Sequence, residues 1–227
     1  MNELMRKIRI LSILVILVIS LSALMPNVYA WGPDAHNDFA VKIAKAFGLG
    51  TTYQDYLKQG CNWPDTAEAG QNPLDHAYNP GTGIGGAAGW AATYADWARS
   101  YYAIGSYNNA FNYLGRASHY TADVSNCFHT SPLGVIYHDT YEQGIMDDWS
   151  SYKNSLNEFV MPGFTPFQCV QNIAGESSID EIGIGYAIST NPSNWKNDPA
   201  VISMTEDNID IGSRYTNSLM YRMLGYY

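Results

Sequence analysis

The side chains best suited to chemistry gather in one central stretch of the chain. His119 and Asp123 are four residues apart, as are His138 and Glu142, and His129 lies between the two pairs. On a helix, a spacing of four places both members of a pair on one face, where they can bind the same ion. Two such pairs with a histidine between them indicate a metal site rather than a set of surface polar groups. Imidazole and carboxylate ligands are those that zinc prefers.

The chain has five histidines, and the two outside this stretch also suit a metal site. His36 falls one turn before Phe39 in a segment with helical periodicity. His76 lies with Asp65 in a segment rich in glycine, proline and asparagine. Taken alone, His36 is more simply interpreted as an ordinary helix residue. Because all five histidines fit one pattern, the metal interpretation is favoured.

The first 30 residues predict a secretory signal peptide. Three basic residues precede an uncharged apolar run over residues 11–25, and a small residue, Ala30, ends the segment. This order of basic, apolar and small residues is typical of an exported protein. The alternative is a membrane anchor, but the run is shorter than the roughly 20 residues that a spanning helix needs. We therefore expect a secreted protein whose mature chain, 31–227, begins at Trp31 and forms one domain.

The composition indicates which classes of binding partner are disfavoured. The chain carries a net charge of −9, and removal of the leader would leave 9 basic and 20 acidic residues. A surface this acidic argues against nucleic-acid binding through basic patches, and nothing implies a protein partner. Three cysteines, Cys61, Cys127 and Cys169, would allow one disulfide in an exported protein and leave one thiol over. Their spacing does not decide which pair forms.

The periodicity of apolar residues predicts an all-α fold with no strands. Residues 60–85 are expected to form a long loop, and a capping box is expected at Ser178–Glu181. Gly115, four residues before His119, should allow a close helix approach on the ligand face. The expected helices cover residues 34–47, 53–58 (short at best), 86–104, 107–126, 136–159, 178–189 and 205–224.

The ordered pattern W…H…D…H…H-x3-D-x5-H…H-x3-E resembles the zinc-dependent phospholipase C family. That family shares a superfamily with single-strand nucleases. The resemblance is densest in D-H-A-Y-N-P (75–80), N-N-A-F-N-Y-L-G-R-A-S-H-Y-T-A-D (108–123), C-F-H (127–129) and H-D-T-Y-E (138–142). It implies a single all-helical domain that holds three zinc ions in a cleft.

The resemblance also implies a ligand set for each ion. Asp123 would bridge two of the ions, and the terminal amine and carbonyl oxygen of Trp31 would serve as ligands after cleavage. The implied sets are Asp65, His76, His119 and Asp123 for one ion; His129, His138 and Glu142 for a second; and His36, Asp123 and Trp31 for the third.

The implied activity is a secreted phosphoric diester hydrolase that cleaves phospholipids to diacylglycerol and a phosphorylated headgroup. Three divalent ions would outweigh the three carboxylates and suit an anionic transition state. Asp65 is the candidate to orient or deprotonate the attacking water. Asp34 is the candidate substrate contact, since choline-specific members have an acidic residue there. Thr66 and Pro73 stand where those members have aromatic residues, so a choline preference is not expected.

Two alternatives stay open. The short Trp31-x4-His36 spacing is more similar to the nucleases, which suggests a single-strand nuclease or 3′-nucleotidase, whereas Glu142 is more similar to the phospholipases. A non-catalytic extracellular zinc-binding protein is the other alternative. Cys127 stands two residues before His129, where the family tends to have proline, so a thiolate ligand is a further, less favoured option.

Overall fold

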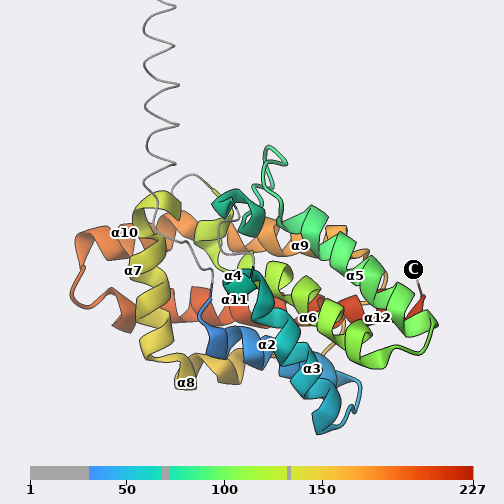
Figure 1. Ribbon diagram of the computed structural model, residues 1–227. Coiled ribbons are helices and arrows are strands. Elements are labelled where there is room, and N and C mark those ends of the chain that lie inside the picture. The colour runs from blue at the N-terminus through green and yellow to red at the C-terminus, as the bar shows by residue number, and fades with distance from the viewer. Residues whose placement is uncertain (1–30, 68–71, 132–133, 227) are drawn as a thin grey trace, which may run out of the picture.

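The computed structural model describes residues 31–67, 72–131 and 134–226 (Figure 1). These ranges contain helices and connecting segments and no strand, which confirms the predicted all-α class. The predicted signal peptide, residues 1–30, lies outside the described residues. Within the described ranges, no helix combines the length and the apolar character needed to cross a membrane.

The helices are connected by short segments, several of which contain a single 3-10 turn. The α-helices are α2 (Pro33–Ala46), α3 (Thr51–Cys61), α4 (Trp63–Ala67), α5 (Ala87–Ala103), α6 (Tyr107–Asp123), α7 (Gly134–Asp147), α8 (Trp149–Tyr152), α9 (Pro166–Ser177), α10 (Glu181–Thr190), α11 (Pro199–Asn217) and α12 (Leu219–Leu224). The 3-10 turns are η1 (Pro73–His76), η2 (Cys127–His129), η3 (Lys153–Ser155) and η4 (Trp195–Asn197).

Helix α6 is the central element of the fold. It packs against α2, α3, α5, α9, α11 and α12, and Figure 1 shows it running through the middle of the molecule. Every residue from Ala117 to its end at Asp123 is buried. The two ligand candidates on α6, His119 and Asp123, are therefore held on all sides by other helices.

Two hydrophobic cores lie on either side of this buried stretch. The first is built mainly from α3, α5, α6, α9 and α12 and includes Leu114 and Tyr120. The second is built mainly from α7, α10 and α11 and includes Trp31 and Tyr141. Both α2 and α6 contribute residues to each core. The buried polar residues on these two helices consequently lie where the cores meet.

Helices α3 and α6 approach so closely that glycine is required at their contact. A Cβ atom at Gly115 would overlap the carbonyl oxygen of Leu57, and one at Gly60 would overlap the carbonyl oxygen of Asn112. The expectation that Gly115 permits a close approach is thus confirmed. The contact matters for the ligands because α4, which carries Asp65, follows directly after α3.

Several predicted boundaries were wrong. The helix expected at 53–58 spans all of Thr51–Cys61, and the loop expected at 60–85 contains α4 and η1. The helices expected at 136–159 and 205–224 are each divided in two. Tertiary packing supplies the burial that these short segments lack by themselves.

Helix α9 was missed, and the capping box was placed in the wrong segment. Thr165 and Gln168 form a true capping box at the start of α9. By contrast, α10 is preceded by Asp180, whose side chain makes no cap hydrogen bond. The serine-to-glutamate spacing at 178–181 falls across the junction of two helices rather than at a helix start.

The disulfide that an exported protein would allow does not form, because all three cysteines are buried free thiols. Cys61 and Cys169 lie in the first core and Cys127 in the second. Burial raises the pKa of Cys169 to about 12 and that of Cys127 well above its usual value. Nearby Glu181 raises the pKa of Cys127 further, so this thiol is disfavoured as a thiolate ligand.

We expect Gly115→Ala to destabilise the protein by at least about 2 kcal/mol, because the added methyl group has no room between two backbones. Gly89→Ala is the matched control, since a Cβ atom there meets nothing within 4 Å. The control should be neutral or stabilising by up to about 1 kcal/mol, since alanine favours a helix. Denaturant unfolding measures both. Equal effects would mean that the α3–α6 contact adapts to a side chain.

Candidate metal centre

The structure brings all five histidines together with three carboxylates. The histidines are buried, and each carboxylate touches at least one of them. Six separate elements supply the eight side chains: His36 from α2, Asp65 from α4, His76 from η1, His119 and Asp123 from α6, His129 from η2, and His138 and Glu142 from α7.

Asp123 is at the middle of the cluster and is completely buried. Its Oδ2 atom lies 2.8 Å from His76 Nδ1 and 3.3 Å from His119 Nε2. Its Oδ1 atom lies 3.4 Å from His36 Nε2. The two oxygens thus face different histidines, which is the arrangement that a bridging carboxylate would need.

Asp65 and the histidines around Asp123 form two overlapping groups. One group is His36, His119 and Asp123, and the other is Asp65, His76 and His119; in each, the ligand atoms lie within 4.8 Å of one another. Asp65 Oδ1 is 3.3 Å from His119 Nε2. Each group shares residues with a ligand set implied by the resemblance, although the first also contains His119 and the second does not include Asp123. The assignment of particular ions to them stays a prediction.

The set His129, His138 and Glu142 forms a chain of contacts beside these two groups. His129 Nε2 lies 2.6 Å from His138 Nε2, which lies 3.3 Å from Glu142 Oε2. His129 Nδ1 can donate to the His76 carbonyl oxygen, and His138 Nδ1 to Asp139, each at 2.9 Å. If both protons sit on Nδ1, both Nε2 lone pairs point at each other. Such an arrangement needs a cation between or beside the two rings.

The electrostatics of the cluster favour neutral imidazoles. Burial, followed by the neighbouring imidazoles, lowers the pKa of His36 and His129 well below the usual value. Burial lowers the pKa of His119 to about 4. His76 differs: burial lowers its pKa, but the hydrogen bond to Asp123 and the nearby carboxylates together outweigh burial and raise the pKa overall. Three of these rings therefore offer lone pairs at neutral pH, which is the state that binds metal.

The pKa values of the carboxylates shift in the opposite direction. Burial raises the pKa of Asp65, Asp123 and Glu142, the last to about 9. Within the described residues, their ion pairs are all with histidines and none is with lysine or arginine. Buried carboxylates without a cationic side chain are costly unless another cation is present.

Several buried polar atoms in the cluster lack a hydrogen-bond partner. They are His36 Nδ1 and Nε2, Asp65 Oδ1, His119 Nδ1 and Asp123 Oδ1. Native proteins rarely leave such groups unsatisfied, and a gathering of them in one place points to an ion that they coordinate. Nitrogen and oxygen donors in this ratio suit zinc. The residues present therefore fit the predicted cofactor.

The Trp31 side chain is anchored next to the cluster. Its Nε1 donates to the Ala122 carbonyl oxygen at 3.0 Å and to Ser125 Oγ at 3.1 Å, and its ring packs against Tyr141. Burial lowers the pKa of His36 most, while the adjacent Trp31 backbone raises it. The end of α6 thus holds Trp31 beside His36. The role of the Trp31 amine as a ligand stays a prediction.

Two acidic residues differ from what the sequence suggested. Asp34, the candidate substrate contact, is exposed on α2 and lines a polar groove whose lining includes none of the ligand candidates. Asp139 was overlooked, although it accepts from His138 and so orients a candidate ligand. Its position directly after His138 was the only signal in the sequence.

Comparison with known proteins identifies structures with a similar fold. No family model matches the chain, and no curated protein matches it. Several solved structures do, and two of them are clostridial alpha-toxins. The alpha-toxin of an avian Clostridium perfringens strain, SWCP, has a TM-score of 0.63 at 16% identity over 86% of this chain. The alpha-toxin of Clostridium absonum has a TM-score of 0.61 at 13% identity over 85%.

The chain has the fold of the clostridial alpha-toxins. The resemblance to zinc-dependent phospholipases C is thereby confirmed at the level of the fold. This chain spans 64% of the length of each toxin, which is slightly less than two thirds.

We expect elemental analysis of the mature protein to find about three zinc ions per chain. Asp123→Asn should lose more zinc and more activity than Glu142→Gln, because Asp123 contacts three histidines and Glu142 contacts one. Zinc per chain and turnover are measured for both variants. A content near one in zinc-replete buffer, or equal losses in the two variants, would contradict the three-ion arrangement.

Zinc uptake should release protons. Because the pKa of Glu142 is about 9 without metal, this carboxyl is protonated near neutral pH and must lose its proton to bind an ion. Glu142→Gln should therefore release about one proton fewer than the wild type, and wild-type affinity should rise as the pH approaches that value. Calorimetry in buffers of different ionisation enthalpy counts the protons. Identical proton release would exclude Glu142 as a ligand.

Proposed function

We propose that the protein is a zinc-dependent hydrolase of phosphodiesters of the phospholipase C type. The observation that carries the proposal is the convergence of five histidines and three carboxylates in one buried cluster without lysine or arginine partners. The alpha-toxin fold supports the same conclusion.

The cluster contains carboxylates that could only hold ions and carboxylates that also contact solvent. Asp123 is fully buried and can only hold ions, whereas the side chains of Asp65 and Glu142 reach the surface in part. Bound zinc would acidify a water and offset the charge of a phosphodiester. Burial raises the pKa of Asp65, which suits it to accept a proton from that water.

A phospholipid fits this centre better than a nucleic acid does. The chain is acidic, with a net charge of −9, which disfavours binding of a polynucleotide. The short Trp31-x4-His36 spacing still favours the nuclease alternative, so both substrates belong in one test.

Purified mature protein with zinc is assayed on zwitterionic phospholipid vesicles and on single-stranded DNA, side by side. We expect release of a phosphorylated headgroup and diacylglycerol from the vesicles, little cleavage of DNA, and loss of activity with a chelator. Asp65→Asn should lower lipid turnover at least about 100-fold, as expected for a general base. Asp55→Asn, an exposed carboxylate on α3, is the matched control and should behave as wild type.

Faster cleavage of DNA than of lipid would establish the nuclease alternative. Three bound zinc ions with no hydrolysis of either substrate would favour the non-catalytic zinc-binding alternative. Equal activity in Asp65→Asn and wild type would remove Asp65 from the proton-transfer role while leaving the substrate assignment intact.

We also expect processing after Ala30 to activate the enzyme. The Trp31 nitrogen is an amide before cleavage and an amine afterwards, and only the amine binds zinc well near neutral pH. A form with extra residues before Trp31 should fold, bind about two zinc ions instead of three, and turn over poorly. Cleaving the extra residues from this precursor, so that the chain begins at Trp31, should restore both properties. If the two forms match in zinc content and turnover, Trp31 is not a ligand.

A further inference from the structure

Helix α10 presents an apolar stripe to solvent. Ile182 and Tyr186 are 73% and 70% exposed, and their spacing of four residues places them on one side of the helix. Ile179, which is 72% exposed, lies in the turn just before the helix begins. Ile184 and Ile188, on the other side, are buried in the second core. The helix is therefore apolar on two faces, of which the described structure covers only one.

The segments that supply metal ligands add exposed apolar side chains to this stripe. Leu74 precedes His76 by two residues and is 51% exposed. Ile136 precedes His138 by two residues and is 65% exposed. In both segments a buried histidine faces the cluster while an apolar neighbour faces solvent, so the apolar surface and the metal centre share the same chain segments.

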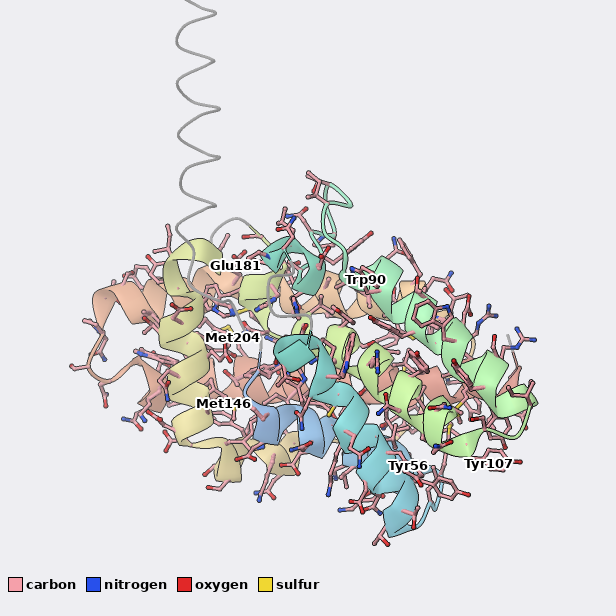
Figure 2. All side chains as sticks on the ribbon, in the orientation of Figure 1. Tyr56, Trp90, Tyr107, Met146, Glu181 and Met204 are labelled. Atoms are coloured by element: carbon pink, nitrogen blue, oxygen red, sulfur yellow. The ribbon has the colours of Figure 1, made fainter. Side chains whose placement is uncertain are left out.

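Hydrogen bonds join these segments to one another. The Tyr78 amide donates to the His129 carbonyl oxygen at 3.0 Å, which ties the η1 segment to η2. Ser131 donates to Glu181, which ties the residues after η2 to the start of α10. Figure 1 shows α10 beside α7, and Figure 2 labels Glu181 along the same edge of the molecule.

The packing of α10 on α7 extends these connections. The ring of Tyr137 lies against Gly185, where a Cβ atom would come within 3.1 Å of it. Tyr137 directly follows Ile136, so the apolar side chains of the two helices lie on adjoining surfaces. We call the set Leu74, Ile136, Ile179, Ile182 and Tyr186 the apolar rim.

The charges of the apolar rim exclude some kinds of partner. Residues 72–86, 134–142 and 176–186 include acidic side chains such as Asp139 and Glu176 but no lysine or arginine. An anionic surface would be repelled rather than attracted. An uncharged or zwitterionic apolar surface meets no such barrier, and its binding would depend little on salt.

We propose that the apolar rim docks the protein on a zwitterionic phospholipid surface, with the metal centre facing the headgroups. This inference rests on the proposed function only for the lipid nature of the substrate. Isoleucine side chains gain free energy when they leave water for the acyl region. Tyrosine favours the level of the headgroups, where its ring is apolar and its hydroxyl stays hydrated.

The test compares the double variant Ile179→Ser/Ile182→Ser with Ile104→Ser. Ile104 is 76% exposed and directly follows α5. Figure 1 shows α5 and α10 on opposite sides of the molecule. Binding is measured by co-sedimentation with vesicles of a choline phosphonolipid, in which carbon replaces the ester oxygen that would be cleaved. Turnover is measured separately on a short-chain phosphodiester dissolved below its micelle concentration.

We expect the double variant to bind vesicles at least tenfold more weakly than wild type, since each buried isoleucine is worth about a factor of ten or more. Its turnover of the dissolved substrate and its thermal midpoint should match those of wild type. Ile104→Ser should match wild type in all three measurements. Wild-type binding should be unaffected by salt and weaker on anionic vesicles.

The proposal is overturned if wild type does not bind the vesicles, if the double variant binds as wild type does, or if Ile104→Ser loses as much binding. It is also overturned if wild type is a dimer that the double variant dissociates, because the rim would then be a self-association surface. Rim-dependent binding without turnover of the dissolved substrate would leave this inference standing and count against the proposed function instead.

Discussion

The burial of Asp123 is the constraint on which the rest of the structure depends. A carboxylate with no exposed surface and no lysine or arginine partner is stable as an anion only beside another cation. Of the three histidines that touch it, burial lowers the pKa of His36 and His119, and only His76 has a raised pKa. Beyond that one imidazole, the described cluster has no cationic side chain for its three carboxylates. Divalent cations would complete it.

The fold holds this unfavourable centre in place by surrounding it with two well-packed cores. Helices α2 and α6 contribute to both cores, so the polar residues between them cannot separate without disrupting apolar packing. Gly115 lets α3 lie directly on α6, and the Trp31 indole is bonded to the end of α6. Rigid support of this kind is what keeps candidate ligands close before any ion is bound.

The outer surface has a different character from the centre beneath it. Neutral imidazoles and carboxylates line the interior, while isoleucine side chains such as Ile136 and Ile182 are exposed to solvent. A phospholipid has the same two parts, a charged phosphodiester and an apolar body. The proximity of polar centre and apolar rim therefore agrees with a substrate that is presented at an interface rather than one that diffuses freely.

What the sequence alone determined was local. The all-α class and the two pairs His119–Asp123 and His138–Glu142 follow from helical spacing, which neighbouring residues decide among themselves. Tertiary structure decided what depends on distant contacts. His76 meets Asp123 across 47 positions, and the segment expected to be a loop folds into α4 and η1 where it packs on α6. Packing leaves the three cysteines as buried free thiols, and only packing shows which side of apolar α10 remains uncovered. The sequence did not reveal these outcomes, because an apolar side chain does not specify which surface will bury it. A sequence shows that a side chain must leave water, whereas the assembled helices determine where it goes.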